Sequence, residues 1–430
     1  MALTGRAVLL VLLGVPVVAL APGWRSAALW LLGVVAVVAL DVALAASPRA
    51  LEVERDLPAS VRLGEPVEGV LVVTNTGSRR LRGVLRDAWP PSAGADGARS
   101  ALDVPPGERR RLRTALRPTR RGDRRVEVVV VRSRGPLGVA ARQASLPAPG
   151  ALRVLPPFAS RRHLPGRLAR LRTLDGSASA SVRGQGTEFD SLREYVPGDD
   201  VRSIDWRATA RASSVVVRTW RPERDRRVLV VLDTSRTSAG RVGDAPRLDA
   251  AMDAALLLAA LASAAGDRVD LLAADRRVRA SVTGVRPPGL LAALVQAMAP
   301  LEASLVEADW SAVVAEVRRR MPHRGLLVLL TPLEAAAVEE SLLPVLPTLL
   351  AAHTVLVSSV ADPAVDAMVA SRGDAPSVLT AAAAERARLE RAALVARMER
   401  SGAEVVDAPP ELLPPRLADA YLALKAAGRL

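Results

Sequence analysis

The clearest chemical pattern in the sequence is a carboxylate followed by two hydroxyls at the end of an apolar run. The segment RVLVVLDTSRTS, residues 227–238, contains Asp233, Ser235 and Thr237 as a D-x-S-x-T motif. Such a run is typical of a buried parallel strand, whose carboxyl end lies where open α/β sheets bind their partners. Three side-chain oxygens on alternate positions suit a hard divalent cation such as Mg²⁺, with water completing its coordination. The structural alternative is that Asp233 caps the next turn through backbone N–H groups.

A second concentration of chemically capable residues lies just before this strand. The stretch GQGTEFDSLREYVPGDDVRSIDWRATAR, residues 184–211, is rich in Gly, acidic, aromatic and Arg residues. One interpretation is a structural lock between domains, in which a charge-paired network lies over packed aromatic side chains. The other is a docking surface for a partner; catalysis is less favoured because no group complements the carboxylates. The candidate residues are Gly184, Gly186, Glu188, Phe189, Arg193, Glu194, Tyr195, Gly198, Asp199, Asp200, Arg202, Asp205, Trp206 and Arg211.

Composition and missing motifs exclude several classes of enzyme. The chain has no Cys, which excludes disulfides and cysteine nucleophiles, and its 3 His lack zinc-ligand spacing. Gly184-Gln185-Gly186 lacks the third glycine of a dinucleotide-binding loop, no P-loop motif is present, and no G-x-S-x-G surrounds Ser235. We therefore expect a non-enzymatic protein, and we expect any ATP that drives its work to be hydrolysed by another chain.

Two apolar segments open the chain, Ala7–Trp24 and Ser26–Ala46. Each approaches the roughly 20 residues that cross a bilayer, so residues 1–48 are predicted to form a transmembrane helical hairpin. A cleaved signal peptide is the alternative for the first segment, but a second apolar segment follows it at once. Three Arg follow within residues 49–62, whereas the loop has only Arg25. This bias predicts a two-pass protein of the inner or plasma membrane, with its soluble part in the cytoplasm.

The remaining chain divides by pattern into three parts. Residues 51–157 contain short β-branched runs separated by turn clusters, which predicts an all-β sandwich. Residues 158–226 are expected to form a linker that carries the signature stretch. From 227 to 430 strands alternate with helices, which predicts an α/β domain with a mainly parallel sheet and helices on both faces. The predicted fold class is therefore multidomain.

The net charge of +14 is unevenly distributed. From Arg109 to Arg183 there are 19 Arg and 3 acidic residues, a local balance of 19 − 3 = +16. This segment lacks the interleaved aromatic residues that stack on bases and any nucleic-acid-binding motif, so nucleic acid is not an expected partner. An anionic membrane surface is at least as good an account of such a basic face.

Both motifs resemble those of known families. The D-x-S-x-T motif resembles the metal-ion-dependent adhesion site of von Willebrand factor A-type domains, in which an acidic group of the partner completes the coordination of the cation. GQGTEFDSLREYVPGDDVRSIDW, followed by RATAR and a strand ending in D-x-S, is similar to the signature of the bacterial family known as domain of unknown function 58. This likeness extends over essentially the whole chain. It implies a membrane-anchored von Willebrand factor A-like protein that works with a MoxR-type AAA+ ATPase.

The chain departs from the adhesion-site pattern in the later loops. Such sites usually add a Thr from a later loop, for which Thr283 is the candidate here, and an Asp from a TDG-like turn. Thr331-Pro332-Leu333 replaces that turn and contains no Asp. A site with one carboxylate binds Mg²⁺ weakly unless a partner donates another.

These observations predict an adaptor that presents a von Willebrand factor A-like face, with a partial metal site, to an AAA+ ATPase or its client. A different class is an envelope scaffold that binds a wall component outside the membrane. The least favoured alternative is a metal-dependent hydrolase that uses Asp233 and the acidic run from Asp199 to Asp205. The sequence does not name the client.

Overall fold

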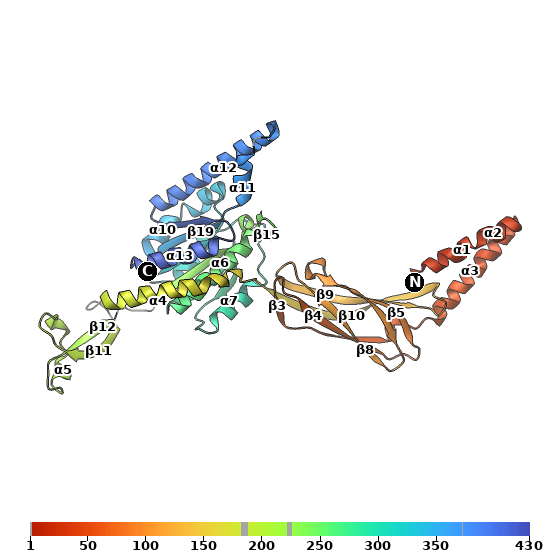
Figure 1. Cartoon of the computed structure of the whole chain (residues 1–430), viewed down its shortest axis with the longest axis horizontal. Helices are drawn as coiled ribbons and strands as arrows, with labels where there is room; N and C mark the ends of the chain where they lie inside the picture. Colours follow the sequence, from red (N-terminus) through yellow and green to blue (C-terminus); the bar gives the residue numbers. More distant parts are fainter. Residues whose placement is uncertain (1, 182–187, 222–225, 372) are drawn as a thin grey trace. The chain divides into compact units, whose positions relative to one another are not determined.

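The chain is multidomain, with an N-terminal apolar helix, extensive β-sheet and a C-terminal α/β region (Figure 1). Its contacts divide it into two compact units, Met1–Pro157 and Phe158–Leu430. The structure is a computed structural model that describes residues 2–181, 188–221, 226–371 and 373–430.

The first unit begins with apolar helices because residues 5–44 contain long apolar runs with few charges. The elements are β1 (Ala2–Leu3), α1 (Gly5–Leu12), α2 (Gly14–Leu20) and α3 (Trp24–Leu44). Trp30 of α3 donates its indole N–H to the Leu10 carbonyl at 3.1 Å, so α1 lies against α3. Gly14 permits this approach, since a Cβ at that position would lie 2.3 Å from the Trp30 ring.

Only one of the two expected apolar spans is long enough by itself to cross a membrane. Among the described residues, the stretch Trp24–Ala50 has the required length and hydropathy, whereas Gly5–Leu20 is a shorter apolar helix. The first span is shortened because the helix is interrupted at Leu13. Leu29 and Leu32 of α3 are at least 70% exposed, which suits a lipid environment better than water. The N-terminal region is therefore consistent with membrane anchoring.

The acidic residue of α3 is surrounded by backbone donors. The Asp41 carboxylate accepts hydrogen bonds from the N–H groups of Leu137, Val139 and Ala140, at 2.8, 2.8 and 2.7 Å, and Asp41 is 0% exposed. A buried carboxylate is tolerated where charge-assisted hydrogen bonds of this kind replace water. Asp41 therefore ties the end of the apolar helix to the turn at residues 135–140.

We expect Asp41→Ala to loosen this connection. The change leaves three backbone N–H groups without their acceptor, and a buried unsatisfied donor costs about 1–3 kcal/mol. We therefore expect a loss of at least about 1–2 kcal/mol in the free energy of unfolding, with faster proteolysis at residues 135–140. Asp103→Ala, which removes an exposed carboxylate paired with Arg80, is the control. Equal protease resistance of Asp41→Ala and wild type would contradict the anchoring role.

Two mainly antiparallel sheets follow in the first unit. Their strands are β2 (Leu51–Asp56), β3 (Ser60–Arg62), β4 (Val67–Asn75), β5 (Leu81–Asp87), β6 (Ala95–Asp96), β7 (Arg99–Val104), β8 (Arg109–Leu116), β9 (Gly122–Arg134) and β10 (Ala140–Leu155). One sheet has the order β1-β10-β9-β5-β7 with β3 on β10, and the other has the order β2-β4-β8-β6. Leu71 and Val73 of the second sheet share a buried core with Leu85, Val129 and Val131 of the first. Alternating buried and exposed residues along the strands produce this arrangement.

The second unit is built on a six-stranded sheet. Its strands are β13 (Arg227–Asp233), β16 (Arg268–Ala274), β17 (Val278–Val282), β18 (Leu326–Leu330), β19 (Thr354–Val360) and β20 (Glu404–Ala408). The order is β17-β16-β13-β18-β19-β20, and all neighbours are parallel except β17, which is antiparallel to β16. The central strands are nearly all Val and Leu because they are buried on both faces. The predicted C-terminal α/β region is confirmed.

Helices cover both faces of this sheet (Figure 1). The principal ones are α6 (Arg247–Ala264), α7 (Leu290–Met298), α8 (Trp310–Arg320), η6 (Val338–Leu342), α10 (Leu346–Ala352), α12 (Ala375–Arg400) and α13 (Leu413–Ala426). On one face Val317 of α8, Leu342 of η6 and Met398 of α12 share a core with Leu327 of β18. On the other face α6 contacts β13 and is covered by α13. The shorter helices are η5 (Arg236–Ala239), α9 (Ala335–Ala337) and α11 (Pro363–Ala370).

The segment expected to be a linker is partly helical. It contains η3 (Ala159–His163) and α4 (Leu164–Ser181). Arg167 and Arg170 of α4 donate to Asp419 of α13 at 2.7 and 2.9 Å, and the Ser160 hydroxyl donates to Asp253 of α6 at 2.8 Å. These polar contacts make residues 158–174 part of the second unit rather than a free connection. The rest of the segment contains β11 (Glu188–Glu194), η4 (Val201–Ser203), α5 (Trp206–Thr209) and β12 (Val216–Arg221).

Candidate functional site

The D-x-S-x-T motif lies where the strand order of the sheet reverses. The chain continues from β13 to β16 on one side and later to β18 on the other side. The carboxyl ends of β13 and β18 therefore form a topological switch point, the place where open α/β sheets bind ligands. Asp233 ends β13 and Thr331 follows β18, so two distant segments supply polar groups to one edge.

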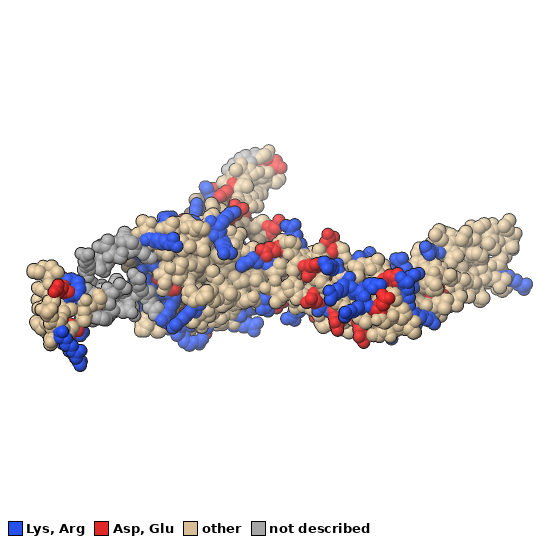
Figure 2. All heavy atoms as spheres, turned by 60° about the horizontal axis from the view of Figure 1, so that its bottom comes forward, with Lys and Arg blue, Asp and Glu red and all other residues tan. Residues whose placement is uncertain are grey.

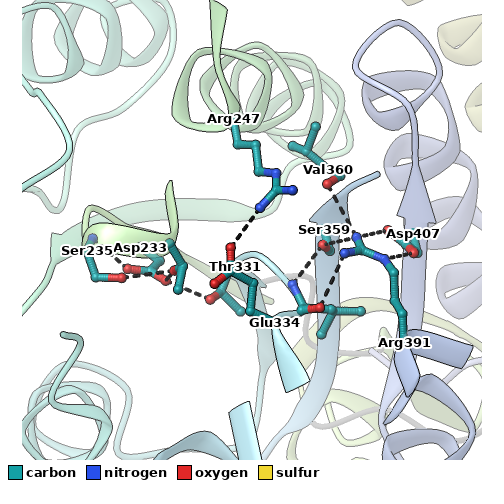
Figure 3. Close-up of polar contacts among 11 residues, drawn as sticks. Asp233, Ser235, Arg247, Thr331, Glu334, Ser359, Val360, Arg391 and Asp407 are labelled. Atoms are coloured by element: carbon teal, nitrogen blue, oxygen red, sulfur yellow. Dashed lines mark hydrogen bonds and ion pairs between the residues drawn. The ribbon is translucent and has the colours of Figure 1, made fainter. Parts of the chain in front are cut away.

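The Asp233 carboxylate is the centre of a buried hydroxyl cluster (Figure 3). Its Oδ2 accepts the Thr331 hydroxyl at 2.7 Å and the Thr237 hydroxyl at 3.4 Å, while Oδ1 accepts the Ser235 N–H at 2.8 Å. The hydroxyl oxygens of Ser235 and Thr237 are 3.1 Å apart. All four residues are at most 5% exposed. The backbone cap and the convergence of oxygen atoms, which the sequence offered as alternatives, are both present.

The charge of this cluster limits what it can bind. Burial raises the pKa of Asp233 above its ordinary value, and the hydrogen bonds from Thr331 and Ser235 oppose that shift. Among the described residues no group of three or more acidic or His side chains could hold a metal. One carboxylate and three hydroxyls have the oxygen chemistry that Mg²⁺ prefers but only one negative charge. A cation here would need a further anionic ligand from another molecule.

The loop after α7 is hydrogen-bonded to the backbone beside this hydroxyl cluster. The Ser304 N–H donates to the Thr234 carbonyl at 2.8 Å, and the Arg236 N–H donates to the Val306 carbonyl at 2.8 Å. Arg236 also forms an ion pair with Glu307 at 2.7 Å. These contacts tie the loop after α7 to residues 234 and 236 of the motif.

A second carboxylate, Asp275, lies beside the cluster after β16. It accepts hydrogen bonds from the hydroxyls of Thr234, at 3.3 Å, and Ser304, and it forms an ion pair with Arg279 at 3.2 Å. Burial acts to raise the pKa of Asp275, but the hydrogen bonds from Ser304 and the Arg277 N–H and the charge of Arg279 hold it below its ordinary value. Asp275 is thus ionised and already balanced by an arginine. Asp275 was not among the residues predicted from the sequence, although it directly follows an apolar strand.

The third hydroxyl of the site is not the one expected from the sequence. Thr283 follows β17, which runs antiparallel to β16 and whose Val282 pairs with Leu271. Asp233 pairs with Ala274, so the antiparallel direction of β17 carries Thr283 towards the opposite edge of the sheet. Thr331 supplies the hydroxyl instead. In the sequence Thr331 stood out only for the Asp missing beside it, but its position directly after a buried strand was the signal for this role.

Arg391 of α12 fixes the turn next to the cluster (Figure 3). Its guanidinium donates to both Asp407 oxygens at 2.5 Å, to the Ser359 hydroxyl at 2.7 Å and to the Leu333 carbonyl at 3.3 Å. Ser359 in turn accepts the Leu333 N–H at 3.1 Å. The turn after Thr331 is therefore held against β19 and β20. Nothing in the Ala, Arg and Glu-rich sequence of α12 distinguishes Arg391 from its neighbours.

The signature stretch forms a small two-stranded module, residues 188–221, in which β11 pairs with β12 in antiparallel fashion. Gly184 and Gly186 lie outside the described residues. Glu188 and Phe189 form backbone pairs at the start of β11. Gly198 has a φ of 110° in the turn that follows β11, a conformation that favours glycine.

Three carboxylates of this module, those of Asp199, Asp200 and Asp205, are occupied by local contacts. Asp199 accepts two hydrogen bonds from the Arg193 guanidinium, at 2.8 and 2.6 Å, and these lower the pKa of Asp199. Asp205 caps α5 by accepting backbone N–H groups and forms an ion pair with Arg218 at 2.8 Å. Asp200 caps η4 in the same way. The charge-paired network expected from the sequence is present in part, with Arg218 as an unexpected member.

The aromatic packing expected beneath this network is absent at Trp206. Trp206 is 69% exposed, and Val217 is the only buried residue among residues 191–218. A two-stranded hairpin is too small to build a core of its own, which explains the exposure. Tyr195 is half-buried. Three other candidates, Glu194, Arg202 and Arg211, form no side-chain ion pair with any described residue.

Comparisons with known proteins identify a family but not a function. Residues 191–400 match the profile of the family described as "Protein of unknown function DUF58". Uncharacterised proteins of Mycobacterium tuberculosis and Mycobacterium bovis are each 29% identical to the chain over 161 residues, 37% of this chain and 50% of each relative. The chain thus spans about half the length of the curated relatives it matches.

Solved structures share only weak likeness with the chain. A CARDB domain from Pyrococcus furiosus is 19% identical and covers 24% of this chain and 91% of its own, with a TM-score of 0.18. The α2-macroglobulin of Escherichia coli is 13% identical and covers 36% of this chain and 9% of its own, with a TM-score of 0.20. Scores this low support no inference. The profile match, which includes most of the signature module and the Asp233 cluster, makes residues 191–400 of the chain similar to the DUF58 family.

Proposed function

We propose that the chain is a non-enzymatic, membrane-anchored interaction protein that binds a MoxR-type AAA+ ATPase. The observation that carries this proposal is that, in the signature module, the carboxylates of Asp199, Asp200 and Asp205 are occupied by local contacts while apolar side chains face solvent. Exposed large apolar and aromatic side chains in one module are typical of a protein interface. The apolar residues that are at least 38% exposed are Leu192, Val196, Val201, Trp206 and Val215.

The proposal includes a von Willebrand factor A-like domain with a partial metal-ion-dependent adhesion site. The order β17-β16-β13-β18-β19-β20, with one antiparallel edge strand, and the D-x-S-x-T motif at the switch point support it. Asp233, Ser235, Thr237 and Thr331 would hold a divalent cation, and a carboxylate of the partner would supply the missing negative charge. In that arrangement the cation links two proteins.

The anchor that we propose is a two-pass hairpin with both ends on the cytoplasmic side, where an AAA+ ATPase could reach the second unit. The contact between Trp30 and Leu10 supports the pairing of the two helical segments. Ala2 pairs with Ala141 of β10, and Asp41 binds the adjoining turn. The start of the hairpin and its end therefore meet the same part of the β-sheets, as expected when both lie on one side of a membrane.

The experiment is co-purification of the full chain with the ATPase from detergent, with and without Mg²⁺ and ATP. We expect Trp206→Ala to weaken binding at least tenfold, because a buried interface Trp typically contributes about 2 kcal/mol or more. The melting temperature should not change, since an exposed substitution alters stability by no more than about 0.5 kcal/mol.

Leu379→Ala is the matched control, because Leu379 is an equally exposed apolar residue, at 73%, on α12. It should bind the ATPase like wild type. If Trp206→Ala binds the ATPase as well as wild type does, the docking surface does not lie on the signature module. If the ATPase is recovered in none of the four combinations of Mg²⁺ and ATP, the adaptor function itself is refuted.

A further inference from the structure

The outer face of the sheet β2-β4-β8-β6 carries three parallel stripes of different chemistry. Strand register places them in rows, because Glu54 pairs with Val72 and Val72 pairs with Arg111. The two neighbouring rows, which contain Thr74 and Val70 of β4, repeat this order of acidic, uncharged and basic residues, and the pattern ends at Glu68, which pairs with Ala115. We call this surface the striped face; its members are Glu52, Glu54 and Asp56 on β2, Val70, Val72 and Thr74 on β4, and Arg109, Arg111 and Arg113 on β8.

The charges of the striped face are exposed and mostly unmatched within the unit. All six charged residues are exposed, whereas the central stripe is partly covered. Arg113 reaches Glu68 at 3.6 Å, but Arg109 and Arg111 form no ion pair with any described residue. Figure 2 shows basic and acidic side chains lying close together on the β-sheets of this unit. Since the acidic stripe lies about 10 Å from the basic one, the face is a poor match for a nucleic acid or an anionic membrane.

This pattern is complementary to itself under one particular symmetry. A two-fold axis parallel to β4 exchanges the two sides of the sheet, so the acidic stripe of one copy faces the basic stripe of the other and the β4 stripes meet. A two-fold axis perpendicular to β4 would place like charges opposite each other. We propose that the striped face binds the striped face of a second copy of this chain, as an isologous dimer with its axis along β4.

The membrane anchor independently selects the same axis. The end of β4 lies at the base of the apolar hairpin, since Thr76 donates its hydroxyl to the Ala50 carbonyl at 2.8 Å and Arg79 donates to the Ala43 carbonyl at 2.9 Å. An axis along β4 therefore leaves both anchors at one end of the dimer, as two chains in one membrane require. The perpendicular axis would send the anchors to opposite ends.

Charge exchange in the full-length chain tests the dimer. The acidic-stripe variant is Glu52→Arg/Glu54→Arg, and the basic-stripe variant is Arg109→Glu/Arg111→Glu. Each also carries Val72→Cys, which is the only thiol because the natural chain has no Cys. With Val72→Cys alone, a short bismaleimide should cross-link two copies, since sheets packed face to face lie about 10 Å apart. Each charge variant by itself should cross-link on the order of tenfold less, because like charges then face each other.

An equal mixture of the two charge variants should recover cross-linking, now only between unlike chains, since each stripe again meets its opposite. The control is Arg86→Glu/Arg99→Glu in the Val72→Cys background, which makes the same charge change on β5 and β7 of the other sheet and should cross-link normally. The proposal is overturned if Val72→Cys alone does not cross-link, if the charge variants cross-link like it, or if the mixture does not recover. If the mixture does not recover cross-linking, the striped face binds a partner other than a second copy of this chain.

Discussion

Asp233→Ala is expected to lower the free energy of unfolding by about 2–4 kcal/mol and to abolish binding of the partner ATPase. The large effect on stability follows from burial, because the change leaves the Thr331 hydroxyl and the Ser235 N–H without their acceptor, and each such group costs about 1–3 kcal/mol. Thermal and denaturant unfolding of the full chain in detergent measures the first effect. Co-purification of the ATPase measures the second.

Asp233→Asn separates the charge of this side chain from its hydrogen bonds. The amide keeps the shape and can still accept one hydrogen bond, so its cost should be much smaller than that of Ala. The pKa of the Asp233 carboxyl is raised in the folded state, so the folded protein binds this proton more tightly than the unfolded chain does. This difference fixes the direction in which stability changes with pH. Wild type should therefore lose stability relative to Asp233→Asn as pH rises from about 4 through the raised pKa. A difference that stays constant with pH would contradict a buried, titrating carboxyl.

The same pair of variants tests the shared cation. If a cation joins Asp233 to a partner carboxylate, wild type should bind the ATPase in Mg²⁺ and release it when the metal is chelated, and Asp233→Asn should fail to bind in either condition although it is folded. An Asn variant that is folded and binds normally, with or without Mg²⁺, would refute the metal-mediated contact. Asp233 would then act only as a cap and as an acceptor for neighbouring hydroxyls.

Arg391→Leu is expected to destabilise the second unit by about 2–3 kcal/mol. Arg391 and Asp407 have side chains only 21% and 22% exposed, so the change leaves a largely buried carboxylate without its counter-charge. Breaking a fully buried pair costs about 3–5 kcal/mol, and the partial exposure here reduces that value. The lost hydrogen bonds to Ser359 and Leu333 should also release the turn after Thr331. Hydrogen exchange should therefore increase at residues 331–334.

The matched control lies one and a half turns away on the same helix. Arg386 forms an ion pair with Glu390, and its side chain is 82% exposed. Arg386→Leu should leave the melting temperature close to that of wild type, because exposed ion pairs contribute little to stability. If both variants unfold alike, the Arg391 network contributes no more than a surface pair. If hydrogen exchange at residues 331–334 is the same in Arg391→Leu as in wild type, the turn after Thr331 does not depend on Arg391.

The sequence by itself determined the features that depend on neighbouring residues. Apolar segments of sufficient length predicted the N-terminal helix, and alternating strands and helices predicted the α/β region. The end of an apolar run placed Asp233, Ser235 and Thr237 at the edge of a sheet. These inferences succeed because periodicity and capping act over only a few residues.

Only the tertiary structure decided which distant groups meet. Thr331 is 98 residues from the carboxylate to which it donates, and Asp275 and Arg391 were not distinguished by their local sequence. Asp233 is buried only in the folded chain, and Trp206 is exposed because its module builds no core. The stripes of the first unit arise from strand register, which aligns β2, β4 and β8. Strand order and register are properties of the whole fold, so no local pattern could supply them.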